Sequence, residues 1–280
     1  QRTLIPIAII WFLISCQTTD QSRSVLVDLP FPNPVHFDGE LAVVSNDYEN
    51  ASRTDKTKKE LGGGVLIETI ILSNYSRRKI GRFLVSKMII QDFKTNLYVD
   101  GIYVDGETDD DFVTKLTEEN KKLVGKEVSL AIDENGVVTK LDYSGLSEYL
   151  TDNNIETEVA KFINPLLNSL SGIDVVYAGK SFSDGQVIHN KQVPYTVEGA
   201  GNFSLSILSK VAGRTTFRGL DCIVITLVGG ADDLKLTITG VALIDLNTGE
   251  SIYSKFYSTS YNKNLEKVVE ISESTIIFNP

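Results

Sequence analysis

The sequence predicts an α+β protein: a large, curved antiparallel sheet with two or three helices packed on its concave face. Three features of the 280-residue chain carry this prediction. Segments rich in Val, Ile, Leu, Phe and Tyr follow one another from residue 64, and strands joined by short turns are usually antiparallel neighbours. Two helical patterns interrupt this series near its middle. Only strand patterns follow from about residue 186, so the helices are segregated and should cover one face of the sheet.

The chain opens with an apolar segment, LIPIAIIWFLISC at residues 4–16, that gives way at once to polar residues. A transmembrane helix needs about 20 apolar residues, whereas the apolar core of a secretion signal has about 7–15. Arg2 supplies the positive charge that precedes such a core. We therefore expect residues 1–15 to be a signal peptide.

The end of this segment, Leu13-Ile14-Ser15-Cys16, resembles the lipobox of bacterial lipoproteins. The resemblance implies that Cys16 is lipidated and is the first residue of the mature chain, which would be bound to the lipid bilayer through its acyl chains. Stable attachment needs more than one such chain, because each buried methylene contributes only about 0.8 kcal/mol. The resemblance also implies a cell-envelope location, and Gln17 in place of Asp favours the outer membrane over the inner membrane.

The chain is acidic, with a formal net charge of −10. Phosphate backbones repel such a chain and no basic patch interleaved with aromatic residues offsets this, so we expect no nucleic-acid partner. Anionic lipid surfaces should repel it as well, so membrane attachment is expected to depend on the acyl chains. Of the two cysteines, Cys16 is assigned to lipidation, which leaves Cys222 without a partner for a disulfide within the chain. The fold must therefore be held by its core.

Residues 16–38 are expected to link the anchor to the fold. The segment after Cys16 is small and polar, which is typical of a flexible tether. Pro30, Pro32 and Pro34 then exclude regular helix and central strand, which predicts an extended arm on the surface of the domain. Residues 47–64 are charged and then glycine-rich, and we predict a loop there.

Strand patterns open the single domain that we expect over residues 39–280. They cover residues 64–73, 79–90 and 93–104, which are rich in apolar and aromatic residues. A hairpin is predicted at residues 127–143, where Asn135-Gly136 supplies the turn.

Two segments near the middle have helical periodicity. Residues 111–124 place apolar side chains near one face, and Gly125 can cap the helix. Residues 153–171 carry a stronger stripe, within which Pro165 should kink or split the helix. We expect the residues of this stripe to belong to the hydrophobic core, and we rank second the alternative that they form the lid of a cavity.

The C-terminal part should contain strands alone. Residues 220–228, LDCIVITLV, are almost wholly apolar, which predicts a strand that is central or buried on both faces. Asn247-Thr248-Gly249 should form the turn between two further strands.

This order of elements resembles the periplasmic lipoprotein-carrier superfamily and the lipoproteins related to it. Two turn signatures, over residues 125–136 and 244–249, also resemble those of uncharacterised bacterial envelope lipoproteins. The resemblance spans roughly residues 100–260. It implies an unclosed antiparallel barrel in which helices form a lid over a hydrophobic cavity.

The residues that could carry chemistry form no recognised catalytic or metal-binding motif, so we expect no catalytic site, no metal and no cofactor. His36 and His189 are far apart in sequence and lack the spacing of metal ligands. The acidic cluster at residues 105–111 fits a helix N-terminus better than a calcium loop, which stays open as an alternative. Cys222 is expected to be a small buried hydrophobe.

We interpret the chain as a non-enzymatic, membrane-anchored binding protein of the cell envelope whose sheet and kinked helix enclose a hydrophobic ligand. An envelope hydrolase ranks last, because the sequence has no nucleophile elbow. The alternative is a structural or surface-interaction lipoprotein without a small-molecule ligand, acting through the acidic cluster or a strand that carries Tyr253, Tyr257 and Tyr261 on one face. The candidate ligand-binding residues are Phe162, Ile163, Leu166 and Leu167 on the helix, with Leu205 and Ile207 facing them.

Overall fold

The computed structural model describes residues 29–61, 63–104, 121–132, 138–142, 177–197, 201–231, 236–261 and 267–279. Every element within these residues is a β-strand. The strands are β1 (Glu40–Ala42), β2 (Tyr48–Glu60), β3 (Val65–Ile80), β4 (Phe83–Val99), β5 (Ile102–Val104), β6 (Glu127–Ile132), β7 (Val138–Asp142), β8 (Ser181–Ser183), β9 (Val187–Val197), β10 (Gly201–Phe217), β11 (Leu220–Ala231), β12 (Leu236–Asp245), β13 (Ser251–Tyr261) and β14 (Lys267–Phe278).

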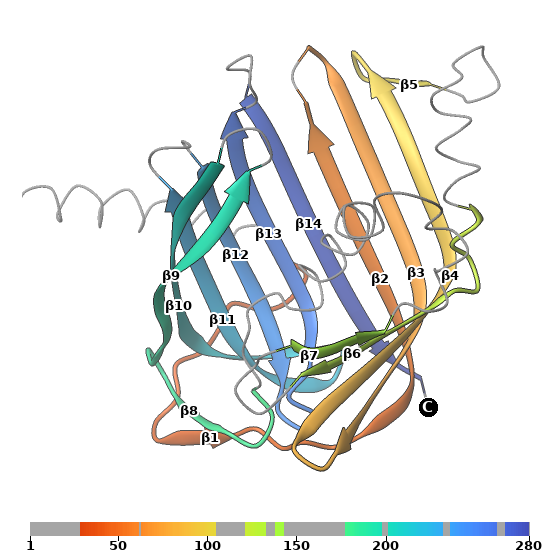
Figure 1. Ribbon diagram of the computed structural model, residues 1–280. Helices are drawn as coiled ribbons and strands as arrows, with labels where there is room; N and C mark the ends of the chain where they lie inside the picture. The colour runs from red at the N-terminus through yellow and green to blue at the C-terminus, as the bar shows by residue number, and fades with distance from the viewer. Residues whose placement is uncertain are drawn as a thin grey trace, which may run out of the picture.

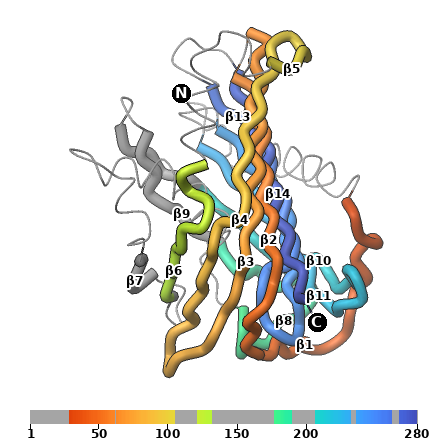
Figure 2. The backbone as a smooth tube through the Cα atoms, turned by 90° about the vertical axis from the view of Figure 1, so that its right-hand side faces the viewer, coloured from red at the N-terminus to blue at the C-terminus, as the bar shows by residue number. Residues whose placement is uncertain are grey.

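One large antiparallel sheet organises the molecule (Figure 1). Its order is β7-β6-β4-β3-β2-β14-β13-β12-β11-β10-β9, with β5 paired to β4, and β1 and β8 form a separate small sheet. The side view in Figure 2 shows β6 displaced to one side of β2, β3 and β4, so the sheet curves around a concave face on that side. The N-terminal arm runs on the opposite, convex side. The strands β2 and β14, from the two ends of the described chain, are neighbours at the centre of the sheet.

The predicted α+β fold is wrong. The described residues are nearly all antiparallel strand, with no helix among their elements, so only the antiparallel sheet of that prediction is confirmed. Of the predicted helix at residues 111–124, the structure describes only the last four residues, of which Lys121 is helical and the others lead with Gly125 into β6 through a turn. Leu123 in this turn is buried in a cluster with residues of β4 and β6. The predicted helix at residues 153–171 lies outside the described residues.

The predicted loop at residues 47–64 is also wrong for most of its length. Residues 48–60 form β2, which lies between β14 and β3. Ala51, Arg53 and Asp55 alternate inward and are buried, while the lysines of this strand point to the convex face or lie near its end. The charged composition of this segment predicted a loop. Arg53 and Asp55 can be buried in a strand only because their charges offset each other once the strand has folded. The described part of the turn contains Gly63 and Gly64, at φ values of +58° and +77°.

The strongest core lies where β11 and β12 are covered on both faces. Successive residues of β11 alternate between two buried clusters, as the apolar run at residues 220–228 predicted. The convex cluster contains Phe31, Phe217, Cys222, Val224, Val241, Leu243, Ile252 and Tyr253. The concave cluster contains Val43, Tyr177, Phe182, Val211, Ile223, Ile225, Ala242 and Ile244.

The proline-rich arm covers the convex side of this core. Phe31 packs edge-on against Tyr253, with ring centroids 5.8 Å apart, and against Phe217 at 6.4 Å. The Thr215 hydroxyl donates to the Pro32 carbonyl at 2.9 Å, and Val35 exchanges two backbone hydrogen bonds with Arg214. A side chain at Gly213 would put its Cβ 2.8 Å from the Val35 carbonyl oxygen, so this glycine permits the close approach of the arm.

Two predicted hairpins are confirmed. β6 and β7 pair as residues 127–143 predicted, although the turn between them lies outside the described residues. β12 and β13 pair across the turn that contains Asn247-Thr248-Gly249. This turn is also a close contact point, because a Cβ on Gly249 would lie 2.6 Å from the Cα of Ala178.

Candidate functional site

The concave face of the sheet carries an unusual set of buried polar residues. Strand alternation places Arg53 and Asp55 of β2 on this face. The cross-strand partner of Arg53 is Ser73, and that of Asp55 is Ser274, which in turn lies opposite Ser254. All are buried. We call this set the polar belt: Arg53, Asp55, Ser73, Ser254 and Ser274.

Arg53 and Asp55 form a closed ion pair. The Arg53 Nε donates to Asp55 Oδ2 at 2.8 Å, and Nη2 donates to Oδ1 at 2.9 Å. The guanidinium also lies 5.4 Å from the centroid of the Tyr75 ring. Burial alone would lower the pKa of Arg53, but the charge and hydrogen bonds of Asp55 more than offset it, so the pKa is raised. The belt therefore holds a charged pair with no net charge, which is the form in which buried charges are tolerated.

The serines of the belt add small polar side chains beside this pair. The Ser73 hydroxyl is buried and has no hydrogen-bond partner among the described residues. An unpartnered buried hydroxyl costs free energy, because it has lost its hydrogen bonds to water. The belt can thus accept or donate a hydrogen bond at Ser73 without breaking an existing one.

Apolar side chains border the belt on both sides. Toward the end of the sheet where β1 lies, Ala51, Tyr75, Met88 and Ile276 form a buried cluster with residues of β6. Toward the end where β5 lies, Ile67, Phe93 and Leu97 are only partly buried. The concave face is therefore closed and apolar at one end and incompletely covered at the other.

A row of small side chains crosses the concave face just beyond the belt. Its members lie on adjacent strands in direct register, and the row ends at Phe256 of β13. The Phe256 ring occupies the space that a side chain at Gly240, its partner on β12, would need. A Cβ on Gly240 would lie 2.0 Å from that ring. The row consists of Ser272, Thr57, Thr69 and Thr95. Small residues in register bring little side-chain volume to this level of the face, unlike the clusters on either side.

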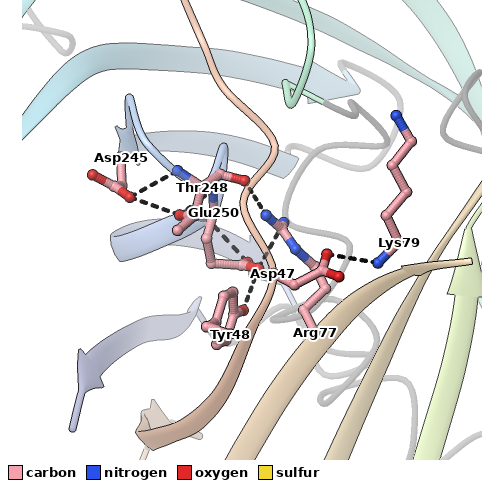
Figure 3. A network of polar contacts seen from close by, with 8 residues as sticks. Asp47, Tyr48, Arg77, Lys79, Asp245, Thr248 and Glu250 are labelled. Atoms are coloured by element: carbon pink, nitrogen blue, oxygen red, sulfur yellow. Dashed lines mark hydrogen bonds and ion pairs between the residues drawn. The ribbon is translucent and has the colours of Figure 1, made fainter. Parts of the chain in front are cut away.

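A second polar network fastens the edge of this face near β1 (Figure 3). The carboxylate of Glu250 accepts a hydrogen bond from the Tyr48 hydroxyl at 2.6 Å and pairs with Arg77 Nη1 at 2.8 Å. Arg77 also donates to the carbonyl of Thr248. Asp245 Oδ2 accepts from both the backbone N–H and the hydroxyl of Thr248, at 3.0 and 2.7 Å. The network ties the β12–β13 turn to β2 and β3.

Burial and charge keep this network in one ionisation state. Desolvation, and then the negative charge of Glu250, raise the pKa of Tyr48 well above its ordinary value. Burial opposes ionisation of Arg77, but Glu250 offsets this and the pKa of Arg77 is raised. Tyr48 and Arg77 therefore stay protonated around neutral pH, and we call the network the clasp, because it holds the β12–β13 turn against β2 and β3.

Five of the predicted site residues lie outside the part of the chain that the structure describes: Cys16, Phe162, Ile163, Leu166 and Leu167. Of the other two, Ile207 is partly buried in a small cluster with Ala231, Leu236 and Ile238. Leu205 lies two residues earlier in β10, opposite Val193 of β9. The predicted acidic cluster at residues 105–111 is also outside the described residues.

The remaining candidates are placed as follows. Cys222 is fully buried in the convex cluster, as predicted, and burial raises the pKa of its thiol to about 12. The His36 ring contacts the Asp184 carboxylate, joining the arm to the turn after β8, while His189 lies in β9. Within the described ranges no three His, Cys, Asp or Glu residues gather as metal ligands would. Tyr253 is buried, whereas Tyr257 and Tyr261 are 38% and 43% exposed.

Sequence reasoning missed the polar belt and the clasp. The signal for the belt was the alternation of Ala51, Arg53 and Asp55, a period of two that indicates a strand even though two of the three residues are charged. The signal for the clasp was the turn signature at residues 244–249, in which Asp245 and Thr248 are the residues that bond to each other.

Comparison of the chain with protein-family models and with curated proteins finds no match. Among the described residues, no helix is long and apolar enough to cross a bilayer. The features that indicate a function are the geometry of the concave face and the sequence of the N-terminal segment.

Proposed function

We propose that this chain is a lipid-anchored protein of the cell envelope, attached to the outer rather than the inner membrane, that binds a hydrophobic ligand without catalysing a reaction. The ligand would lie on the concave face of the sheet. Its apolar part would contact the partly buried residues near β5, and a polar group, where the ligand has one, would reach the polar belt.

One observation carries this proposal: the concave face is incompletely covered at the level of the small-residue row. Ile67, Phe93 and Leu97 stay partly buried there, whereas Ala51, Tyr75, Met88 and Ile276 are buried on the same face toward β1. Ligand sites are typically concave and mostly apolar, with a few placed polar groups. The row of small residues and the belt beside it supply that combination.

The chemistry of the face supports binding more than catalysis. Arg53 has a raised pKa and cannot serve as a base, and its charge is already neutralised by Asp55. Nucleophilic serines need a neighbouring base that can take their proton. The described cross-strand neighbours of the belt serines are serine, arginine, aspartate and apolar residues, none of which is a histidine.

Anchoring is tested by the variant Cys16→Ser. We expect the wild-type chain to sediment with membranes and to incorporate labelled palmitate, and the variant to lose the label and appear in the soluble fraction. Retention of the variant on membranes, together with no label in the wild type, would contradict the proposed lipid anchor.

Ligand binding is tested by mass spectrometry of protein purified without detergent washing. We expect a lipid or another apolar molecule to co-purify with the folded chain. An unliganded mass for the whole population, together with no binding of added fatty acid, would contradict the proposed ligand.

The second candidate function is surface interaction without a small-molecule ligand. It is favoured by Tyr257 and Tyr261, which remain exposed on the convex face although they belong to the strand that also carries buried Tyr253. Exposed tyrosines are frequent at interfaces. The same mass-spectrometry experiment separates the two functions, because this one requires no bound molecule.

A further inference from the structure

The β3–β4 hairpin differs in charge from the rest of the chain. Between residues 69 and 91 there is no Asp or Glu, although the whole chain has a net charge of −10. The same stretch contains five cations: Arg77, Arg78, Lys79, Arg82 and Lys87. A local basic segment in an acidic protein can be attracted to a surface that repels the rest of the molecule.

The tip of this hairpin exposes an apolar side chain. Ile80 pairs with Phe83 across a two-residue turn, in which Gly81 has a φ of +61°. Ile80 is 58% exposed, whereas Phe83 is partly buried. The tip lies at the lower extremity of the molecule in both Figure 1 and Figure 2, so it can meet a flat surface without obstruction.

Two of the five cations are free to meet such a surface. Arg77 is buried against Glu250, while Arg78 pairs with Glu49 and Lys87 pairs with Glu127. Lys79 and Arg82 are exposed, and neither side chain has a carboxylate within 4.0 Å among the described residues. They flank Ile80 directly in the sequence and at the turn.

An open groove of about 500 Å³ continues this surface along the convex side of the hairpin. Its apolar lining comes from Ile80, Val85 and Ile89. Its polar lining includes Arg78 with its partner Glu49, Lys87, and asparagines of β2 and β3. The exposed tip with its two cations therefore continues into a groove that is apolar along one side and carries paired charges along the other.

We propose that this hairpin tip is a second membrane contact, which binds anionic lipid headgroups through Lys79 and Arg82 and inserts Ile80 at the boundary between headgroups and acyl chains. Cations near an anionic bilayer, combined with an exposed apolar side chain, are the features of interfacial binding. The proposal builds on the proposed anchor, which would hold the hairpin close to a bilayer. It corrects the expectation from net charge alone, because the repulsion of the whole chain is reversed locally.

The test uses the unacylated chain, residues 17–280, which retains every contact of the described residues. Its binding is measured by co-sedimentation with vesicles of phosphatidylcholine alone or mixed with phosphatidylglycerol, at low and high salt. We expect binding to the mixed vesicles alone, weakened by salt. The double variant Lys79→Glu/Arg82→Glu should weaken this binding by about tenfold or more, and Ile80→Ser should weaken it without lowering the melting temperature.

A matched control reverses the same number of charges elsewhere. Lys180, just before β8, and Lys210 in β10 are exposed and lie outside the hairpin, so Lys180→Glu/Lys210→Glu should leave most of the binding intact. Equal loss in both double variants, or equal binding to neutral and anionic vesicles, would overturn the proposal. Binding of the wild-type chain to poly-glutamate through the hairpin, without binding to any vesicle, would also overturn it, because the hairpin would then bind an acidic polymer and no membrane. Because this chain carries no acyl group, the result is independent of the palmitate test of the anchor.

Discussion

Asp245 is a buried carboxylate whose partners are supplied by its own turn. Its Oδ2 accepts two hydrogen bonds from Thr248, and Thr248 and Glu250 then hold Arg77 of β3. One side chain thereby fixes a local turn and, through it, a contact between strands far apart in sequence.

The variant Asp245→Ala should lower the free energy of unfolding by about 1–3 kcal/mol, because it leaves the buried N–H and hydroxyl of Thr248 without their acceptor. Chemical denaturation measures this change. Asn247→Ala is the control, since Asn247 is exposed in the same turn and its side chain takes no part in the clasp. Equal stability of the two variants would show that the turn is held by other contacts.

Cys222 provides a prediction of pH dependence. Burial, followed by the charges of Asp245 and Asp221, raises the pKa of the thiol from 9.0 to about 12 in the folded chain. The folded state then binds a proton more tightly than the unfolded state, so the free energy of unfolding should fall as the pH rises from about 9 toward 12. Buried tyrosines with raised pKa values act in the same direction.

This dependence is measured by denaturant titration at several alkaline pH values. Cys222→Ala should be less stable at pH 7 but should lose less further stability above pH 9 than the wild type does. In a Cys16→Ser background, Cys222 should also react with a thiol reagent at pH 8 only after unfolding. Rapid labelling of the native chain would contradict its burial.

At the residue scale, the sequence predicted those features that depend only on residues nearby in the chain. The burial of Cys222 follows from its apolar strand, and the turn at Asn247-Thr248-Gly249 follows from turn chemistry. The pairing of Arg77 with Glu250 could not be predicted, because 173 positions separate the two residues and only the fold brings them together. The same holds for the unpartnered hydroxyl of Ser73.

At the scale of elements, the arm of residues 29–37 behaves as part of the core. Phe31 is 9% exposed between Phe217 and Tyr253, while Val35 in the same arm is 62% exposed and contributes backbone hydrogen bonds. The prolines predicted an extended conformation. They could not predict which side chain of the arm would be buried.

Phe31→Ala should lower the free energy of unfolding by about 3 kcal/mol, since it removes an aromatic ring from a packed cluster. Val35→Ala changes the same arm at an exposed position and should cost little. Thermal and chemical denaturation measure both. If Phe31→Ala were as stable as the wild type but more readily cleaved within the arm, the arm would pack without stabilising the sheet.

The composition of β2 explains why a loop was predicted for this part of the fold. A central strand is usually apolar, but β2 reads as YENASRTDKTKKE. Its inward positions hold a closed ion pair, and its outward positions carry lysines such as Lys58, which pairs with Glu68 of β3. Such a strand is stable only after its neighbours are in place, so no local pattern of hydropathy identifies it.

At the scale of the whole molecule, the sequence predicted an antiparallel sheet but not which segments of the chain form its strands. A short turn predicted that β12 and β13 are neighbours, and they are paired in the structure. Residues 79–90 were predicted as one strand, but they contain the turn between β3 and β4. The pairing of β2 with β14 joins the two ends of the described chain, and nothing local specifies it. The prediction of an α+β fold gave weight to helical periodicity near the middle of the chain, whereas the described residues are almost entirely strand.

The proposed hydrophobic ligand lies on the concave face at the small-residue row. Thr69 and Ile70 are adjacent in β3, and strand alternation places Thr69 in that row and Ile70 on the opposite face. Thr69→Trp fills the row, whereas Ile70→Trp adds the same ring outside it. Both variants should keep the melting temperature close enough to the wild type for binding to be compared.

The most direct measurement is titration of the wild type and these two variants with a fluorescent fatty acid, followed by mass spectrometry of the molecules that co-purify with each. We predict that the wild type and Ile70→Trp bind the probe and retain the same molecule, while Thr69→Trp binds at least about tenfold more weakly, a loss of about 1.4 kcal/mol. Equal binding by all three folded chains, or none by the wild type, would contradict a ligand site on the concave face.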